Sequence, residues 1–443
     1  MTNKKKINKE LELYPSQPDL RKNKDINSVA MSINPHTSLL HTKQNNAYKP
    51  SMPIVPSINH AAAYTYDDVH TLSEIYQNRD KGFTYARTGN ATTQHVEAKI
   101  NHLEKGIGCV SFTTGMAAYD ALFFTLLCSG DHVIASKFLF ANSISLLKSY
   151  AHRFKLELSF IDITSDKELK NVIKHNTKLV LVETIANPCT QIPAFAEIGK
   201  LCKKHNLVYV IDNTITSPAA FIPKDVGASI VIHSLTKSIT GHSRALGGAV
   251  IDTGLFDWSN YSGIEEAYKK FGSQAYILQL RKKGLRDKGA SLTSSQADLI
   301  AIGLETLYMR VNAANKNAID LANFLSQNKK IISVLHPSLI NHKQYKFAKK
   351  YFTDAQYGSL ISFTLADGIE PFKFLENLNL ILNCSSIGDN RTLIIHPAST
   401  IFAELSAEQH KEMGISYNTF RLSVGIENVN DLINDLSNSL AAL

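Results

Sequence analysis

The chain reads Val231-Ile232-His233-Ser234-Leu235-Thr236-Lys237, followed by Gly241-His242 and Gly247-Gly248. An apolar strand thus runs directly into the hydroxyl residues Ser234 and Thr236 and into Lys237. The glycines beyond them let the backbone approach a ligand closely. Because burial lowers the pKa of an ammonium and makes it a nucleophile, the stretch predicts a phosphate site beside a reactive amine. The alternative is a surface lysine that follows a core strand.

Composition describes an ordinary globular protein. Of 443 residues, 44% are hydrophobic and 19% are charged, which excludes disorder of the whole chain. No apolar run reaches the roughly 18 residues of a membrane span. The cluster Lys4-Lys5-Lys6 has no apolar stretch behind it, so we expect no secretory signal and a cytoplasmic protein without membrane contact. The 5 cysteines lack C-x-x-C spacing, and we expect reduced thiols and no metal site.

The net charge of +8 is concentrated at one end of the chain. Residues 1–50 carry nine Lys and Arg against four Asp and Glu, which is +5, and the other 393 residues carry the remaining +3. Basic polar tails are usually solvated, so we expect no nucleic-acid partner. A protein of a different class, which binds a partner through this tail, is the alternative.

The pattern of apolar runs divides the chain into four parts. We expect a polar basic extension over residues 1–45, an N-terminal arm over 46–100, a ligand-binding α/β domain over 101–297 and a smaller α/β domain over 298–443. A polar link is expected around 258–273. Alternating strands and helices predict a parallel sheet that is covered on both faces. The expected strands are 108–112, 132–135, 179–182, 208–211, 229–233, 360–365 and 421–424, and the expected helices include 116–127, 195–205 and about 296–328.

Polar residues follow the expected strands where each strand ends. Ligands of parallel sheets lie beyond the carboxyl ends of the strands, so these side chains should converge on one crevice. Asp212 is a carboxylate at such an end, and a protonated pyridine nitrogen is a suitable partner for it. The alternative is an aspartate that caps a helix or a turn. The strand-end residues are Glu183, Asn187, Asp212, Asn213, Ser234, Thr236 and Lys237.

Three further places carry candidate binding groups. Thr113-Thr114-Gly115-Met116 lies between a strand and a helix, where free amides favour an anion, although simple capping has the same geometry. Tyr85 and Arg87 lie on the arm, and Arg87 is a candidate for bidentate phosphate binding or for a plain surface charge. Arg421 is a candidate clamp for a carboxylate, or a strand-edge arginine in water.

Together these motifs resemble the Cys/Met metabolism family of pyridoxal-phosphate (PLP) enzymes over residues 46–443. The resemblance is carried by Y-x-R at Tyr85 to Arg87, an S-G-M-like turn at Thr114 to Met116, E-x-x-x-N-P from Glu183 to Pro188, D-N-T from Asp212, S-x-T-K-x-x-x-G-H from Ser234 to His242, and R-L-S-V-G-x-E from Arg421 to Glu427.

The resemblance implies a fold, a cofactor and roles for residues. The fold is the aspartate-aminotransferase-like PLP fold type I, with a large, mostly parallel seven-stranded sheet and a smaller C-terminal α/β domain. Lys237 would bind PLP as a Schiff base and carry protons. Arg421 and Ser386, with Asn187, would bind the substrate. Residues implied at the cofactor are Tyr85, Arg87, Gly115, Met116, Phe140, Asn187, Asp212, Ser234 and Thr236.

In the family, the arm reaches the neighbouring subunit's site. The resemblance therefore implies that Tyr85 and Arg87 act in a partner subunit, which requires at least a dimer and suggests a tetramer.

Within the family, 285–290, 303–307 and 388–400 resemble the O-acetylhomoserine sulfhydrylase branch of methionine biosynthesis. This implies γ-replacement on O-acetyl-L-homoserine with sulfide or a small thiol, giving homocysteine or a thioether and acetate. O-succinylhomoserine sulfhydrylase, cystathionine γ-synthase and methionine γ-lyase activities remain alternatives.

Several positions depart from the family pattern. Phe140 stands where most members stack a tyrosine on the cofactor, so stacking is kept and the phenol is lost. Ser385 replaces the glutamate of cystathionine synthases, and Asn142 replaces the cysteine usual in methionine γ-lyases. Both replacements favour the sulfhydrylase branch.

Overall fold

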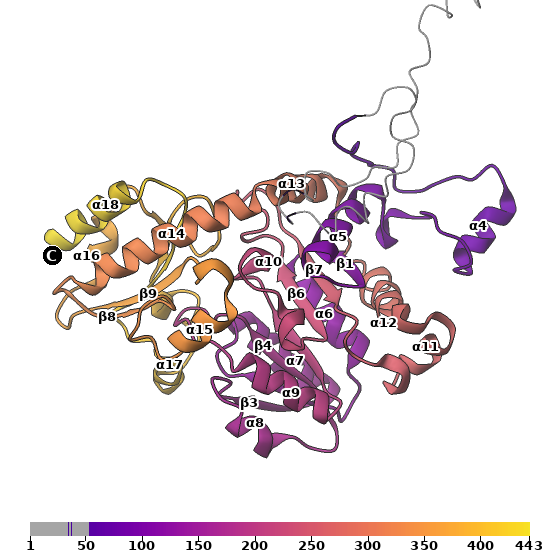
Figure 1. Cartoon of the computed structure of the whole chain (residues 1–443), viewed down its shortest axis with the longest axis horizontal. Coiled ribbons are helices and arrows are strands. Elements are labelled where there is room, and N and C mark those ends of the chain that lie inside the picture. The colour runs from indigo at the N-terminus through magenta and orange to yellow at the C-terminus, as the bar shows by residue number, and fades with distance from the viewer. Residues whose placement is uncertain (1–33, 35–36, 38–52) are drawn as a thin grey trace, which may run out of the picture. The chain divides into compact units, whose positions relative to one another are not determined.

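The computed structural model describes residues 34, 37 and 53–443, and residues 51–443 form one compact unit. Apart from two residues, the expected basic extension over 1–45 lies outside the described part. Figure 1 shows the strands of the larger sheet in the middle of this unit and the C-terminal elements gathered on one side of it.

The larger sheet has 7 strands in the order β1-β7-β6-β5-β4-β2-β3. Only β7 runs antiparallel to its neighbours, and the remaining pairs are parallel. The sequence-based prediction of a mostly parallel seven-stranded sheet is therefore confirmed. The strands are β1 (Gly108–Phe112), β2 (His132–Ser136), β3 (Glu157–Ile161), β4 (Thr177–Glu183), β5 (Val208–Asp212), β6 (Ile230–Ser234) and β7 (Gly248–Asp252).

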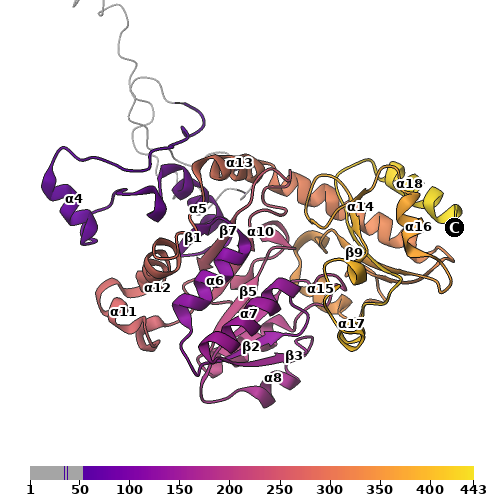
Figure 2. The same cartoon turned by 180° about the vertical axis from the view of Figure 1, so that it is seen from behind.

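Both faces of this sheet are buried, which explains why its strands are apolar throughout. On β4, Leu179 and Leu181 belong to a core shared with α6 (Gly115–Leu126) and α7 (Ala141–Phe154). The alternate residues Val180 and Val182 belong to a second core, shared with α9 (Phe195–Lys204). Figure 2 shows α6 and α7 in front of the sheet.

The smaller sheet has 5 strands in the order β10-β11-β12-β9-β8. Its apolar face packs on α14 (Leu307–Ser326) and α18 (Val429–Ala441), which share one core with β9 and β12. The strands are β8 (Ile331–Leu335), β9 (Leu360–Leu365), β10 (Leu382–Asn383), β11 (Leu393–Ile395) and β12 (Thr419–Ser423).

The other helices cover the sheets or connect them. None of the helices within residues 53–443 is long and apolar enough to cross a membrane. Their bounds are α4 (Val69–Tyr76), α5 (Ala91–Leu103), α8 (Lys167–Val172), α10 (Ser217–Ala220), α11 (Glu265–Phe271), α12 (Ala275–Gln279), α13 (Ser294–Glu305), α15 (Tyr345–Tyr351), α16 (Pro371–Glu376) and α17 (Ala407–Met413).

Two expectations of local structure are wrong. The single helix expected over about 296–328 is two helices, α13 and α14, which meet at Thr306. Near the end of α13, Gly303 packs closely on the preceding loop, because a methyl group there would collide with the carbonyl oxygen of Thr240. The expected polar link around 258–273 contains the buried ring of Trp258 and helix α11.

Candidate active site

A cavity of about 450 Å³ lies at the carboxyl ends of β4, β5 and β6, and Arg421 of the smaller sheet also lines it. It brings together ten of the twelve residues that the sequence proposed as a site. These are Gly115, Met116, Phe140, Asn187, Asp212, Ser234, Thr236, Lys237, Ser386 and Arg421.

Lys237 lies in the turn that follows β6. Its backbone amide donates to the carbonyl of Ser234 at 3.2 Å, which holds the turn against the end of the strand. Its Nζ donates to Oγ of Ser386 at 3.4 Å. Burial, and secondarily the charge of Arg421, lower the pKa of Lys237 below its usual value. The amine therefore has a larger neutral, nucleophilic fraction than an exposed lysine.

One end of the cavity is suited to an anion. Thr114 caps α6, and its hydroxyl accepts from the amide of Ala117 at 3.0 Å. Gly115, the first residue of α6, lines the cavity beside Ser234. A helix N-terminus offers unpaired amides and a partial positive charge. Close packing maintains this end, because a methyl group on Gly115 would lie 2.9 Å from Cβ of Ser234.

Gly248 of β7 offers a test of this packing. A methyl group there would collide with the carbonyl oxygen of Thr114 and approach the amide of Gly115. We expect Gly248→Ala to lower the free energy of unfolding by about 1–3 kcal/mol and to weaken cofactor binding, both measurable on the purified apoprotein. Gly130→Ala is the control, because Gly130 has a positive φ of 86° but open space around it. Gly130→Ala should lower stability without weakening cofactor binding. If it weakens cofactor binding as much as Gly248→Ala does, the explanation is contradicted.

Two carboxyl groups end adjacent strands, and their environments differ. Asp212 of β5 accepts from the amide of Thr214 and from the hydroxyl of Tyr119, each at 2.8 Å. Glu183 of β4 is its register partner and, among the residues that the structure describes, accepts only from the amide of Phe140, at 2.7 Å. Burial, and then the charge of Asp212, raise the pKa of Glu183 well above its usual value. Glu183 therefore holds its proton more tightly than an exposed glutamic acid does.

Arg421 of β12 is a buried cation, with 1% of its surface exposed. Its Nη2 donates to the carbonyls of Ser385 at 3.1 Å and Ser386 at 2.9 Å, and Nη1 to Oδ1 of Asn187 at 3.5 Å. Within the described residues it has no carboxylate partner, and its Nε makes no hydrogen bond. Burial lowers its pKa to about 10. Such a guanidinium is suited to an anionic ligand.

A buried network lies behind the strands that carry the site. Glu104 accepts from Nε2 of His233 at 2.6 Å and from the side chain of Asn213 at 2.7 Å. His233 directly precedes Ser234, and Asn213 directly follows Asp212. The carboxylate thus ties together the ends of β5 and β6, which fixes the spacing of two cavity residues.

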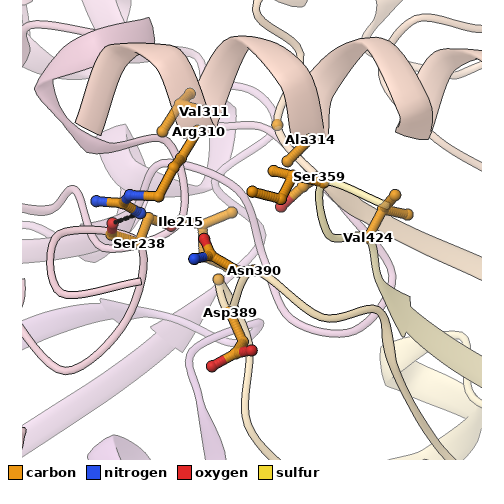
Figure 3. A pocket seen from close by; sticks show the side chains of 12 residues that line it. Ile215, Ser238, Arg310, Val311, Ala314, Ser359, Asp389, Asn390 and Val424 are labelled. Atoms are coloured by element: carbon orange, nitrogen blue, oxygen red, sulfur yellow. Dashed lines mark hydrogen bonds between the residues drawn. The ribbon is translucent and has the colours of Figure 1, made fainter. Parts of the chain in front are cut away.

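Arg310 of α14 fixes the segment after Lys237. Its Nη1 donates to the carbonyl of Ser238 at 2.7 Å, and its Nη2 to that of Ile239 at 3.1 Å. Figure 3 shows Arg310 reaching from the helix to Ser238 beside a small second cavity. A side chain on Gly241 would occupy the position of this guanidinium, so the glycine allows the close approach.

Tyr85 and Arg87 are the two proposed site residues that do not line the cavity. The guanidinium of Arg87 lies 5.6 Å from the ring centre of Tyr85 and donates to the carbonyl of Arg286 at 2.5 Å. Tyr85 is 48% exposed. Their expected role in a neighbouring subunit stays a prediction.

Some cavity residues were not proposed from the sequence. Tyr119 follows Gly115 by four residues, so the two lie on the same face of α6, and this spacing could have identified it. Glu183 was noted at a strand end but given no role. Leu246, Ile387 and Ile401 form an apolar part of the wall, for which the sequence offers no local pattern.

The side chains present fit PLP. The cavity offers a helix N-terminus with two hydroxyls for a phosphate, a carboxylate for a ring nitrogen, an aromatic ring, an amine for an aldehyde and a buried arginine for a substrate carboxylate. The unpaired, buried Nε of Arg421 and Oε2 of Glu183 also indicate that a polar ligand completes the site.

Comparisons with known proteins agree with this chemistry. The sequence pattern of the Cys/Met metabolism PLP-dependent enzymes matches residues 36–441. O-acetyl-L-homoserine sulfhydrylase of Leptospira meyeri is 31% identical over 93% of this chain and 98% of its own length. An L-methionine gamma-lyase of Fusobacterium nucleatum is 34% identical over 88% of this chain and 93% of its own length.

A solved structure extends the agreement to the fold. A Campylobacter jejuni protein described as an O-acetylhomoserine (thiol)-lyase, with a pyridoxyl-lysine phosphate group, superposes with a TM-score of 0.88. It is 30% identical, and the match covers 92% of this chain and 100% of that one. This chain is therefore a member of the Cys/Met metabolism family of PLP-dependent enzymes, has PLP fold type I and uses pyridoxal phosphate as its cofactor.

Proposed function

We propose that the protein catalyses γ-replacement on O-acetyl-L-homoserine, with sulfide or a small thiol as nucleophile, giving L-homocysteine or a thioether and acetate. The observation that carries this proposal is the convergence of Lys237, Asp212 and Arg421 on one cavity. Relatives named O-acetyl-L-homoserine sulfhydrylase in Leptospira meyeri and Corynebacterium glutamicum support it.

Each proposed cofactor contact follows from the position of a side chain. Ser234, Thr236 and the amides of Gly115 and Met116 would hold the phosphate. Asp212 would pair with the ring nitrogen, Phe140 would stack on the ring, and Asn187 would contact the ring hydroxyl. When bound, PLP supplies the electron sink that makes the protons at Cα and Cβ of the substrate removable.

Lys237 is the proposed proton carrier. The Nζ removes the Cα proton and later one from Cβ, and its lowered pKa favours both transfers near neutral pH. Acetate leaves Cγ with the bonding electron pair, the sulfur forms its bond to Cγ, and the thiol proton is released. Lys237 returns protons to Cβ and Cα. Arg421 holds the α-carboxylate, and Ser386, which accepts from Nζ, supports the lysine beside the substrate.

The wall of the cavity favours a short, uncharged acyl group. Leu246, Ile387 and Ile401 contribute apolar surface. Lys237 and Arg421 are the only Lys or Arg in the cavity lining that the structure describes, and both have proposed roles. A succinyl group would bring a second carboxylate without a cation to pair with it, which is unfavourable in a partly buried site. Acetyl is the better fit.

The arm residues complete the proposal for the phosphate. We propose that Tyr85 and Arg87 bind the cofactor phosphate of a partner subunit, since neither lines the cavity of its own chain. The active unit would then be a dimer, and two dimers would form a tetramer.

γ-Elimination is the second candidate, because a relative in Fusobacterium nucleatum is named L-methionine gamma-lyase. One assay separates the two reactions. With O-acetylhomoserine and sulfide, we expect homocysteine as the main product, and at least tenfold lower kcat/KM with O-succinylhomoserine, as expected for an unpaired carboxylate (about 1.4 kcal/mol or more). Accumulation of 2-oxobutyrate without a thiol product would identify elimination. Preference for the succinyl ester would contradict the choice of acyl group.

A further inference from the structure

Tyr119 makes a contact that the mechanism above does not use. It lies on α6, one turn after Gly115, with 3% of its surface exposed, and it lines the cavity. Its hydroxyl donates to Oδ2 of Asp212 at 2.8 Å. A phenol from the helix that begins at the anion end of the cavity therefore reaches the carboxylate at the end of β5.

This donor completes a two-point support for the carboxylate. The amide of Thr214 donates to Oδ1 of Asp212 at 2.8 Å, and Tyr119 donates to Oδ2. Because the donors come from a loop and from a separate helix, they restrain rotation of the carboxylate and leave other lone pairs free for a ligand.

The phenol is a permanent donor. Burial, and then the charges of Asp212 and Glu183, raise the pKa of Tyr119 well above its usual value. The phenol therefore keeps its proton near neutral pH and remains a hydrogen-bond donor there.

We propose that Tyr119 is a positioning residue that orients the Asp212 carboxylate toward the ring nitrogen of the cofactor. This inference rests on the contact between Asp212 and the ring nitrogen proposed above. Tyr119 acts through Asp212, so its removal changes how the cofactor is bound and how its electrons are distributed, and the fold is retained.

The test compares two tyrosines that each donate to an aspartate. Tyr119→Phe should raise the PLP dissociation constant of the apoprotein about tenfold, the usual effect of losing one hydrogen bond to a charged group. It should also shift the visible absorption maximum of bound PLP. Tyr150→Phe is the matched control, because Tyr150 donates to Oδ1 of Asp120 at 2.5 Å, is also buried and does not line the cavity. It should change neither quantity.

Two further variants make the result unambiguous. Asp212→Asn should weaken PLP binding more than Tyr119→Phe does; unchanged affinity would refute the contact with the ring nitrogen itself. If Asp212→Asn weakens binding and Tyr119→Phe does not, only the role of Tyr119 is refuted. Replacing Tyr119 by 3-fluorotyrosine keeps the ring and provides a stronger hydrogen-bond donor. The affinity for PLP should therefore be retained, and this variant can be tested even if Tyr119→Phe folds poorly. A loss of PLP affinity in the 3-fluorotyrosine protein would also overturn the inference.

Discussion

Lys237→Ala should abolish the covalent attachment of PLP and lower turnover by at least about 10⁴-fold, since one amine both binds the aldehyde and carries the protons. The wild-type protein should be yellow, and borohydride should fix the cofactor to the peptide that contains Lys237. In the variant, the yellow absorbance should be lost and borohydride should leave the mass of the chain unchanged. A variant that remains yellow and gains the mass of the cofactor would refute the assignment of Lys237.

Lys99 provides the control for this experiment. It is also a buried lysine, with 4% of its surface exposed, and burial lowers its pKa as well. Its Nζ lies 3.6 Å from a carboxylate oxygen of Glu305, and it does not line the cavity. Lys99→Met should therefore lose some stability and keep both the yellow colour and the turnover. The comparison separates the effect of a lowered pKa from that of position in the cavity.

The sequence predicted that polar residues at the ends of neighbouring strands converge, and in the structure they line one cavity. Glu183, Asp212 and Ser234 are the last residues of β4, β5 and β6, which are neighbours in the sheet. Alternation of strands and helices predicts parallel strands, and parallel strands place their carboxyl ends at one edge. Convergence of these side chains follows from chain topology alone, without knowledge of packing.

Contacts between distant segments could not be predicted in the same way. Arg310 looks like one polar residue in a long helix, yet it reaches the carbonyl oxygens of Ser238 and Ile239, about seventy residues earlier in the chain. Tyr119 looks like a core aromatic, since its hydrogen bond to Asp212 depends on how α6 packs against β5. Strand β7 was not predicted, because Gly247 and Gly248 were interpreted only as residues that let the backbone approach a ligand.

Unlike Arg310 and Tyr119, Arg421 should contribute strongly to substrate binding while contributing little to the stability of the apoprotein. It is a buried guanidinium without a carboxylate partner among the described residues, so the folded apoprotein bears an uncompensated charge. A bound α-carboxylate would supply the missing partner and could form a bidentate pair. The same group that weakens the apoprotein should therefore contribute strongly to substrate binding.

Arg421→Met should lower kcat/KM by about 10²-fold or more, since loss of one partner of a buried charge pair costs about 2–5 kcal/mol. The loss should lie mainly in KM. The free energy of unfolding of the apoprotein should change by less than about 1 kcal/mol, because relief of the buried charge offsets the lost bonds to Ser385 and Ser386. Arg421→Lys keeps the charge but cannot form a bidentate pair, so its kcat/KM should lie between those of the wild type and Arg421→Met. If Arg421→Met strongly destabilises the apoprotein while KM stays unchanged, Arg421 has a structural role and another group must bind the carboxylate.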